Sequence, residues 1–266
     1  MRAAPLAYGH GTTNARDEAA FLVLRGLRLP FETPGNREAT RREQERVAHL
    51  LHRRLRDRVP TAYLLREAWL AGERFYVDRR AIVPRSHIAQ MLAERMRPWL
   101  PRAPHRVLDL CTGSGCLAIL AAKAFPRAQV DAADLSRGAL EVAARNLALH
   151  RLSHRVRLWR SDLLAKLAGE RYDLLITNPP YVTKAAMRRL PREFTHEPAL
   201  ALDGGADGLE LVRKILSGAR DALRPRGVLV CEVGAARPAV QRAFPRTPFV
   251  WTQGGAVFVL PREELG

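Results

Sequence analysis

The sequence predicts an α/β protein, in which a small helical N-terminal region precedes a mostly parallel, doubly wound sheet of seven strands. From Arg106 onward, short apolar runs alternate with amphipathic stretches, the order that builds a parallel sheet covered by helices. The last two runs meet at Gly254 and Gly255, so they should pair as an antiparallel hairpin. Expected strands cover 106–110, 128–133, 155–159, 172–177, 227–232, 247–252 and 255–260, and expected helices cover 115–125, 136–150, 207–223 and 235–243.

The first part of the chain has helical patterns. Residues 15–28 carry apolar side chains at helical spacing. Thr40 and Glu43 form a capping-box pattern ahead of a second apolar series, and Pro60 suits the first turn of a short third helix. We therefore expect residues 1–67 to form a helical domain.

The next stretch changes character. Aromatic and β-branched residues surround Asp78–Arg80, which predicts two short strands joined by a turn at these residues. We expect a β-hairpin linker over residues 68–84. The main domain then covers residues 85–266, and Ser86 should cap its first helix.

Composition narrows the class of protein. A hydrophobic share of 47% is enough for a large core, and no run of about 18 apolar residues predicts a membrane span. Met1–Tyr8 lacks the apolar stretch of a signal peptide. Cys111, Cys116 and Cys231 lack the pairing of zinc sites or disulfide scaffolds, so we expect reduced thiols in a cytoplasmic protein.

The net charge of +17, from 44 basic and 27 acidic residues, favours an anionic partner such as nucleic acid. Only four of the basic residues are lysines, which indicates a general preference for arginine in the composition. RNA affinity and composition bias are equally good explanations at this point.

A glycine-rich loop, Asp109–Gly115, runs from the first strand of the predicted sheet into a helix. Glycines let the backbone approach a ligand closely at the helix N-terminus. Gly113–Ala118 also fits the dinucleotide pattern G-x-G-x-x-A. Asp109 favours S-adenosylmethionine instead, because a carboxylate there can hold the cationic amino-acid end of this cofactor, directly or through water. The cofactor-binding candidates in the loop are Asp109, Cys111, Thr112, Gly113 and Gly115.

Two carboxylates after later strands extend the candidate cofactor site. Asp134 ends the second strand, 21 positions after Gly113, where a carboxylate can accept both ribose hydroxyls. Asp131 is the alternative, but Asp134 lies nearer the carboxyl end of the strand, where ligands bind. Asp162 follows the third strand and is placed to face the adenine amino group; the alternative is a solvated turn aspartate.

The fourth strand ends in Asn178-Pro179-Pro180-Tyr181. The prolines have fixed φ and no N–H, so their carbonyls can face a substrate without neighbouring donors. The Asn178 side-chain oxygen and the Pro179 carbonyl can together accept both hydrogens of an –NH₂ group. Tyr181 offers an aromatic face to a planar amide or base. The alternative is a rigid turn at the end of a strand.

These acceptors suit methyl transfer to a planar nitrogen. The lone pair of an amide or aromatic amine is delocalised, so the nitrogen is a poor nucleophile. Two aligned acceptors place it in line with the methyl–sulfonium bond and favour its rehybridisation. We predict catalytic roles for Asn178, Pro179, Pro180 and Tyr181, with Asn178 also bordering the cofactor.

The two motifs resemble those of the HemK/Prm group of protein-glutamine methyltransferases, although adenine-amino methyltransferases of DNA and RNA share them. The stretches that distinguish the two lie elsewhere. They resemble the branch that methylates a glutamine of the third large-subunit ribosomal protein: Tyr8–Thr12, Phe75–Asp78, Val83–Ser86 and Leu190–Pro198. The sister branch, which acts on release factors, typically reads Pro-Arg-Pro-Asp-Thr-Glu where this chain has Pro84-Arg85-Ser86-His87.

The resemblance covers nearly the whole chain and implies a class I, Rossmann-like S-adenosylmethionine methyltransferase that modifies the glutamine N(5) nitrogen. It also implies that the helical residues 1–67 are a substrate-recognition domain. It implies that Asn178 and Pro179 hold the amide, and that Asp109, Gly113, Gly115 and Asp134 line the cofactor site. Family members carry a further helix before the Tyr8–Thr12 stretch, whereas seven residues precede Tyr8 here. We expect that difference to affect substrate docking rather than chemistry.

The implied partner is a basic large-subunit ribosomal protein. Since a basic enzyme and a basic free substrate repel each other, we expect ribosomal RNA or a subunit assembly intermediate to assist recruitment. Two other functions stay open at this point. One is an adenine N(6) methyltransferase that acts on a flipped base of RNA or DNA. The other is a non-catalytic RNA-binding assembly factor, which the presence of Asp109, Asp134 and Asn178 disfavours.

Overall fold

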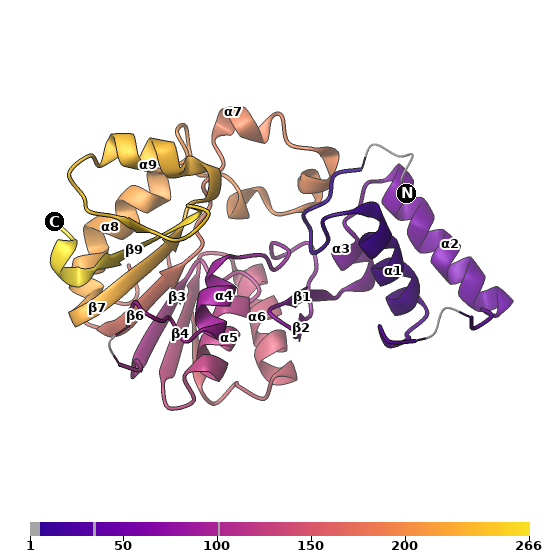
Figure 1. Cartoon of the computed structure of the whole chain (residues 1–266), viewed down its shortest axis with the longest axis horizontal. Helices are drawn as coiled ribbons and strands as arrows, with labels where there is room; N and C mark the ends of the chain where they lie inside the picture. Colours follow the sequence, from indigo (N-terminus) through magenta and orange to yellow (C-terminus); the bar gives the residue numbers. More distant parts are fainter. Residues whose placement is uncertain (1–5, 34–35, 101) are drawn as a thin grey trace.

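The computed structural model describes residues 6–33, 36–100 and 102–266. Three helices, α1 (Ala15–Gly26), α2 (Arg41–Arg56) and α3 (Thr61–Leu65), pack on one another at one end of the molecule, and a twisted sheet occupies the other end (Figure 1). The sequence prediction for Met1–Tyr8 lies largely outside the described residues.

The described part of the sheet has seven strands in the order β5-β4-β3-β6-β7-β9-β8. Their bounds are β3 (Arg106–Leu110), β4 (Gln129–Asp134), β5 (Val156–Arg160), β6 (Tyr172–Thr177), β7 (Leu223–Glu232), β8 (Val250–Trp251) and β9 (Val257–Pro261). Strands β3 to β7 are parallel, and β9 is antiparallel to both β7 and β8. The predicted mostly parallel sheet with a closing antiparallel hairpin is therefore confirmed.

Helices cover both faces of the sheet, as the alternation of strands and helices predicts (Figure 1). One face packs against α4 (Ile88–Ala93), α5 (Cys116–Ala124) and α6 (Arg137–Leu149). The other packs against α8 (Glu210–Ala222) and α9 (Arg237–Ala243). Neighbouring strand residues point to opposite faces. Val107 and Leu108, both fully buried, accordingly belong to different core clusters.

A capping box and the buried Arg54 stabilise the N-terminal helices. The Thr40 side chain accepts from the backbone of Glu43, whose carboxylate accepts from the Thr40 N–H, so the predicted capping box is present. Arg54 of α2 donates to both carboxylate oxygens of Glu18 on α1, at 2.8 and 3.1 Å. The same guanidinium donates to Glu193, far along the chain, at 3.0 Å. This contact ties the helical part to the segment that follows β6.

The hairpin is shorter than the sequence predicts. It consists of β1 (Ala68–Leu70) and β2 (Glu73–Phe75), and its turn is at Ala71 and Gly72, both with positive φ. The prediction of a hairpin turn at Asp78–Arg80, within a linker hairpin over 68–84, is wrong.

A turn does form at Asp78, but no strands flank it. The Asp78 carboxylate accepts from the Arg80 N–H, which makes a local side-chain turn. The flanking backbone donors bond to side chains instead of to a strand partner: the Tyr76 N–H to Asn146 and the Val83 N–H to Glu197. None of the helices in the part of the chain that the structure describes has the length and hydrophobicity of a membrane span.

Candidate active site

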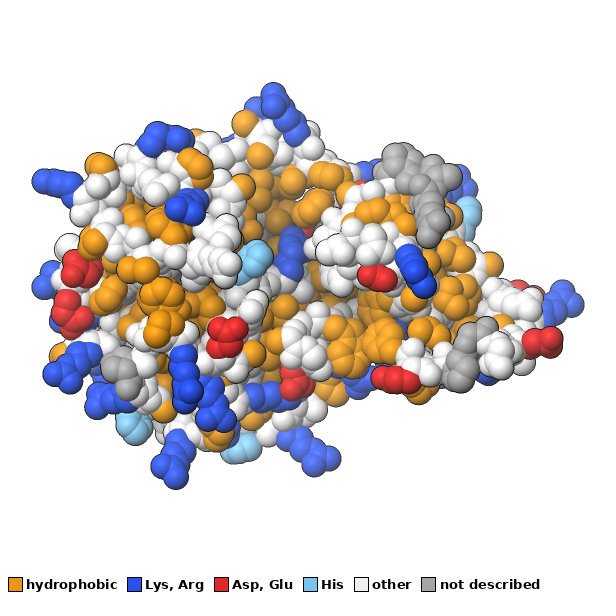
Figure 2. Space-filling view, viewed as in Figure 1, with side chains coloured by type: hydrophobic (Ala, Val, Ile, Leu, Met, Phe, Trp, Pro, Cys, Tyr) orange, Lys and Arg blue, Asp and Glu red, His pale blue; other side chains and the backbone are white. Residues whose placement is uncertain are grey.

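A cavity of about 490 Å³ opens at the carboxyl ends of the parallel strands, the usual position of ligand sites in doubly wound sheets. In the space-filling view, hydrophobic side chains gather in the hollow between the helical part and the sheet part (Figure 2). The cavity walls include the ends of β3, β4, β5 and β6, the linker around Ala81–Arg85 and the segment 182–202.

The glycine loop forms one wall through Cys111 and Gly113, both of which have positive φ. Gly115, at φ +78°, is the N-cap residue of α5, and a Cβ there would lie 3.0 Å from the Cβ of Ala143 on α6. Only glycine meets both demands at position 115. Gly115 and Thr112 are outside the residues that line the cavity; they shape the loop from behind.

Asp109 lies fully buried beneath this loop and is not among the lining residues. Its Oδ2 accepts the Thr112 hydroxyl and, at 3.0 Å, the Ala118 N–H. Its Oδ1 has no hydrogen-bond partner in the described part of the chain. Burial raises the pKa of this carboxyl to about 7, against the effect of its two donors. The unpaired oxygen is itself buried, so a cationic ligand group in the cavity could meet it only through the loop, for example by way of a bridging water.

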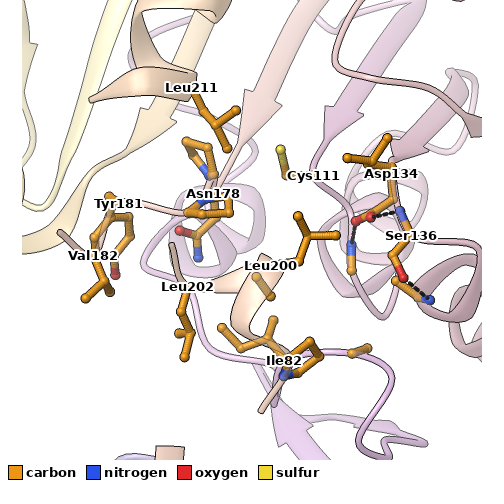
Figure 3. Close-up of a pocket in the computed structure, with 18 of the residues that line it drawn as sticks. Ile82, Cys111, Asp134, Ser136, Asn178, Tyr181, Val182, Leu200, Leu202 and Leu211 are labelled. Atoms are coloured by element: carbon orange, nitrogen blue, oxygen red, sulfur yellow. Dashed lines mark hydrogen bonds between the residues drawn. The ribbon is translucent and has the colours of Figure 1, made fainter. Parts of the chain in front are cut away.

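Asp134 lines the cavity opposite Asn178 and Tyr181 (Figure 3). Its carboxylate accepts the Gly113 N–H at 2.9 Å and the Ser136 N–H at 2.8 Å, which fixes both oxygens. Burial raises its pKa, and the two backbone donors oppose that effect. The carboxylate is therefore held rigidly at the cavity edge.

Asp131, the alternative to Asp134, bonds to side chains of the fold and not to the cavity. Its carboxylate accepts from Arg106, Arg157, Trp159 and Tyr172, and it is not among the residues that line the cavity. Asp162 does line the cavity, exposed at the end of β5 next to Ser161.

The tetrapeptide Asn178–Tyr181 lies at the end of β6, and all four residues line the cavity. The Asn178 Nδ2 donates to the backbone carbonyl of Arg85 at 3.2 Å. Tyr181 is half-buried, and a Cβ at Gly234 would lie 2.8 Å from its ring, so the glycine leaves room for the aromatic side chain. In Figure 3, Asn178 and Tyr181 are together on one side of the cavity.

The segment after the tetrapeptide supplies a wall that sequence patterns alone did not indicate. It contains α7 (Lys184–Met187) and two 3₁₀ turns, at Arg192–His196 and Ala199–Ala201. Its apolar residues that line the cavity are Val182, Leu190, Phe194, Pro198, Leu200, Ala201 and Leu202. Two buried glutamates hold the segment in place, since Glu193 bonds to Arg54 and Arg58 and Glu197 bonds to Arg85.

Arg80, Ile82, Arg85 and Ser136 also line the cavity without having been predicted as site residues. Arg85 is part of the Val83–Ser86 stretch that carries the family resemblance, so the only sequence signal for it was that likeness.

The cavity fits S-adenosylmethionine. A rigid carboxylate, Asp134, faces the space and can accept ribose hydroxyls, and the neighbouring Leu135 offers an apolar surface that is 48% exposed. Beneath the loop, Asp109 has one unpaired oxygen for the cationic end of such a ligand. The loop backbone at Gly113 and Cys111 borders the same space. The ribose hydroxyls and the cationic end of the cofactor thus each have a complementary carboxylate in this chain.

Comparisons with known proteins find methyltransferases among the relatives of this chain. The model of the methyltransferase small domain matches residues 88–206. A curated ribosomal protein uL3 glutamine methyltransferase of Bordetella pertussis is 51% identical over 100% of this chain and 92% of its own length. The Bradyrhizobium diazoefficiens protein of the same name is 50% identical over 93% of this chain and 81% of its own length.

Among solved structures, the hMettl16 catalytic domain in complex with a MAT2A 3'UTR hairpin matches with a TM-score of 0.54 and 14% identity, over 83% of this chain and 80% of that chain. At this identity the likeness shows the fold alone. The two curated relatives match almost the whole chain, with about half of the residues identical. They therefore distinguish glutamine methylation from adenine methylation, which the shared motifs alone could not do. This chain belongs to the ribosomal protein uL3 glutamine methyltransferase family.

Proposed function

We propose that this enzyme transfers a methyl group from S-adenosylmethionine to the N(5) nitrogen of a glutamine side chain in ribosomal protein uL3. The observation that carries the proposal is the Asn178 amide, which lines the cavity while its Nδ2 bonds to the Arg85 carbonyl. Because the donor end of the amide is engaged, its Oδ1 is the end left to accept from a substrate –NH₂.

The substrate amide is held by acceptors from the tetrapeptide. Asn178 Oδ1 takes one hydrogen of the –NH₂ group, the Pro179 carbonyl takes the other, and the Pro180–Tyr181 side packs on the amide plane. Both acceptors stabilise the positive charge that develops on the nitrogen during transfer. The apolar wall from segment 182–202 excludes water from the reacting atoms.

S-adenosylmethionine supplies an electrophilic methyl carbon on a sulfonium. When bound, it would give up this methyl group to the amide nitrogen: the C–S bond would break as the N–C bond forms, the sulfur would keep the electron pair as a neutral thioether, and the extra amide proton would leave to solvent. Asp134 is proposed to hold the ribose hydroxyls and Asp162 the adenine amino group. Asp109 is proposed to hold the ammonium, with the loop backbone from Cys111 and Thr112 to Gly113 and Gly115 around it.

Labelled cofactor tests this function. Incubation with free uL3 or with a large-subunit assembly particle should place the labelled methyl group on one glutamine, identified by peptide mass spectrometry. Replacing that glutamine by glutamate should abolish labelling, because the product needs an amide nitrogen. Label in RNA without label in uL3 would instead support adenine methylation and contradict the proposal.

We further propose that ribosomal RNA in an assembly intermediate assists recruitment, in the cytoplasm, and that residues 1–67 form the substrate-recognition domain. Lys and Arg side chains project around the visible outline of the molecule (Figure 2). Four basic residues on the segment beside the cavity are exposed: Lys184, Arg188, Arg189 and Arg192. Contacts of these residues with phosphates would offset repulsion between a +17 enzyme and a basic substrate.

The recruitment proposal predicts salt dependence. Methylation of the particle should slow steeply as salt rises, and the double variant R188E/R189E should lose activity on the particle while keeping activity on free uL3. Equal rates at low and high salt on the particle would contradict RNA-assisted recruitment and leave the methyltransferase proposal standing.

A further inference from the structure

The stretch Val83–His87, called the linker from here on, is bonded on either side to two buried glutamates from different parts of the chain. On one side, Glu197 accepts from the Val83 N–H at 3.0 Å and from both terminal nitrogens of Arg85, at 2.6 and 2.7 Å. On the other side, Glu232 at the end of β7 accepts from the Ser86 hydroxyl and, at 2.9 Å, from the His87 N–H. The backbone between these anchors has little freedom to move.

The Arg85 carbonyl lies between these anchors and accepts from Asn178 Nδ2. A carbonyl can only accept, so it discriminates between the two ends of the Asn178 amide. In the observed orientation the amide nitrogen meets the carbonyl. A flipped amide would place two oxygens against each other and turn N–H groups toward a substrate –NH₂. The Arg85 carbonyl thereby decides which end of Asn178 is offered to the substrate.

We infer that Glu197 and Arg85 are positioning residues that set the orientation of the Asn178 amide. Glu197 does not line the cavity and its side chain is fully buried, so it acts only through its neighbours. Its bidentate contact with Arg85 holds the linker backbone in the position where the Arg85 carbonyl accepts from Asn178 Nδ2. This inference rests on the proposed role of Asn178 as the acceptor for the substrate amide.

Glu197 and Arg85 form a bidentate ion pair with two short hydrogen bonds. The two N–H···O contacts are parallel and charge-assisted, the type of hydrogen bond that combines strength with directional precision. The Arg85 guanidinium also lies over the Phe194 ring, 5.5 Å from its centroid. His10 from the N-terminal segment approaches Glu197 at 3.5 Å. Arg85 is therefore held by groups on the segment after the tetrapeptide, and its carbonyl moves with them.

A double-mutant cycle tests the inference. Glu197→Gln keeps the shape of the side chain but leaves one Arg85 nitrogen facing an amide –NH₂, so it should lower kcat roughly tenfold with little change in cofactor affinity. In the Asn178→Ala background the same substitution should lower kcat less than about twofold, because no amide is left to orient. Cofactor affinity is measured by calorimetry and folding by thermal unfolding.

Glu193→Gln is the matched control. Glu193 is also a buried, arginine-paired glutamate on the same segment, but it bonds to Arg54, Arg58 and Ala7 of the N-terminal part and not to Arg85, whose carbonyl meets Asn178. Any loss of kcat that it causes should multiply with that of Asn178→Ala. If Glu197→Gln unfolds the protein, the double substitution R85M/E197L, which replaces the pair by apolar side chains, serves in its place.

The outcomes distinguish the proposed acceptor role of Asn178 from the positioning role of Glu197 and Arg85. Near-normal turnover of Asn178→Ala alone would overturn the proposed role of Asn178 and this inference with it. A large loss for Asn178→Ala together with fully multiplicative effects of Glu197→Gln would overturn only the positioning role.

Discussion

Gly204 lies directly against Tyr181: a Cβ at position 204 would be 2.7 Å from the Tyr181 Cα and 2.9 Å from the Pro180 carbonyl oxygen. The backbone there is paired, since the Val182 N–H donates to Leu202 at 2.9 Å and the Gly204 N–H donates to Val182 at 2.8 Å. The chain around Tyr181 and Val182 therefore fits against residues 202–204 with no space for a side chain at position 204.

Gly204→Ala should displace the tetrapeptide while leaving the cofactor side of the cavity in place. A misplacement of about 1 Å costs roughly 100-fold in rate. We expect kcat to fall by that order and cofactor affinity to stay within about twofold. Gly218→Ala is the control, because its Cβ would meet only the flexible end of Leu164. Equal turnover of the two variants would contradict the close fit at Tyr181.

Asn178→Ala removes the proposed acceptor for the substrate amide. Turnover should fall by ~100-fold or more, the scale of losing a key electrostatic group. Cofactor affinity should change little, because the proposed ribose and ammonium partners, Asp134 and Asp109, are untouched. Steady-state methyl transfer and calorimetry measure the two quantities. Near-normal turnover would show that the amide is held elsewhere.

Asp134→Asn should weaken cofactor binding. The carboxylate accepts from two backbone N–H groups and still has lone pairs for ribose hydroxyls, whereas an amide nitrogen at one position would face those N–H donors. Loss of hydrogen bonds to a charged group predicts a rise in Kd of roughly 10- to 100-fold. Asp131→Asn should lower stability but not cofactor affinity, since its partners are structural. The reverse pattern would make Asp131 the ribose ligand.

The strands, the main helices and both motifs could be predicted because each depends on local sequence. Strand β6 is buried along its whole length and has an apolar centre, Leu174–Ile176, and Asn178–Tyr181 follows it directly in the chain. The hairpin turn could not be placed, because Asp78 makes a turn signal from its own side chain while the real turn uses positive φ at Ala71.

The site walls contributed by the linker and by segment 182–202 depend on contacts between residues far apart in sequence. Arg85 and Glu197 are separated by more than a hundred positions, yet they form one ion pair beside Asn178. Composition and periodicity carry no signal for such a pair. The burial of Asp109 behind the loop, rather than in the cavity wall, likewise follows from the packing of α5 and not from the motif itself.

The raised pKa of Asp109 should make the stability of the folded protein depend on pH. The pKa is raised from 3.8 to about 7 by burial, so the folded protein binds this proton more tightly than the unfolded chain. The resulting stabilisation is fully present below about pH 4 and is lost as pH rises to about 7. The free energy of unfolding of the wild type, relative to Asp109→Asn, should therefore fall across this range by an amount on the order of a few kcal/mol. A difference that stays constant from pH 4 to 8 would mean that the Asp109 pKa is ordinary.

Replacing Arg54 should weaken the contact between the N-terminal helices and the catalytic part of the chain. The Arg54 side chain is only 1% exposed and neutralises Glu18 on α1 and Glu193 beside the cavity. Arg54→Met leaves both carboxylates buried without this partner, which should cost roughly 3–5 kcal/mol of unfolding free energy.

Arg41→Met is the control for this variant, because the Arg41 side chain is 93% exposed and its pair with Glu45 should contribute almost nothing. Denaturant unfolding measures both variants. Because Glu193 is part of the segment that lines the cavity, Arg54→Met should also raise KM for uL3 below its unfolding temperature. Loss of stability with an unchanged KM would show that the helical part supports the fold without shaping the substrate side of the site.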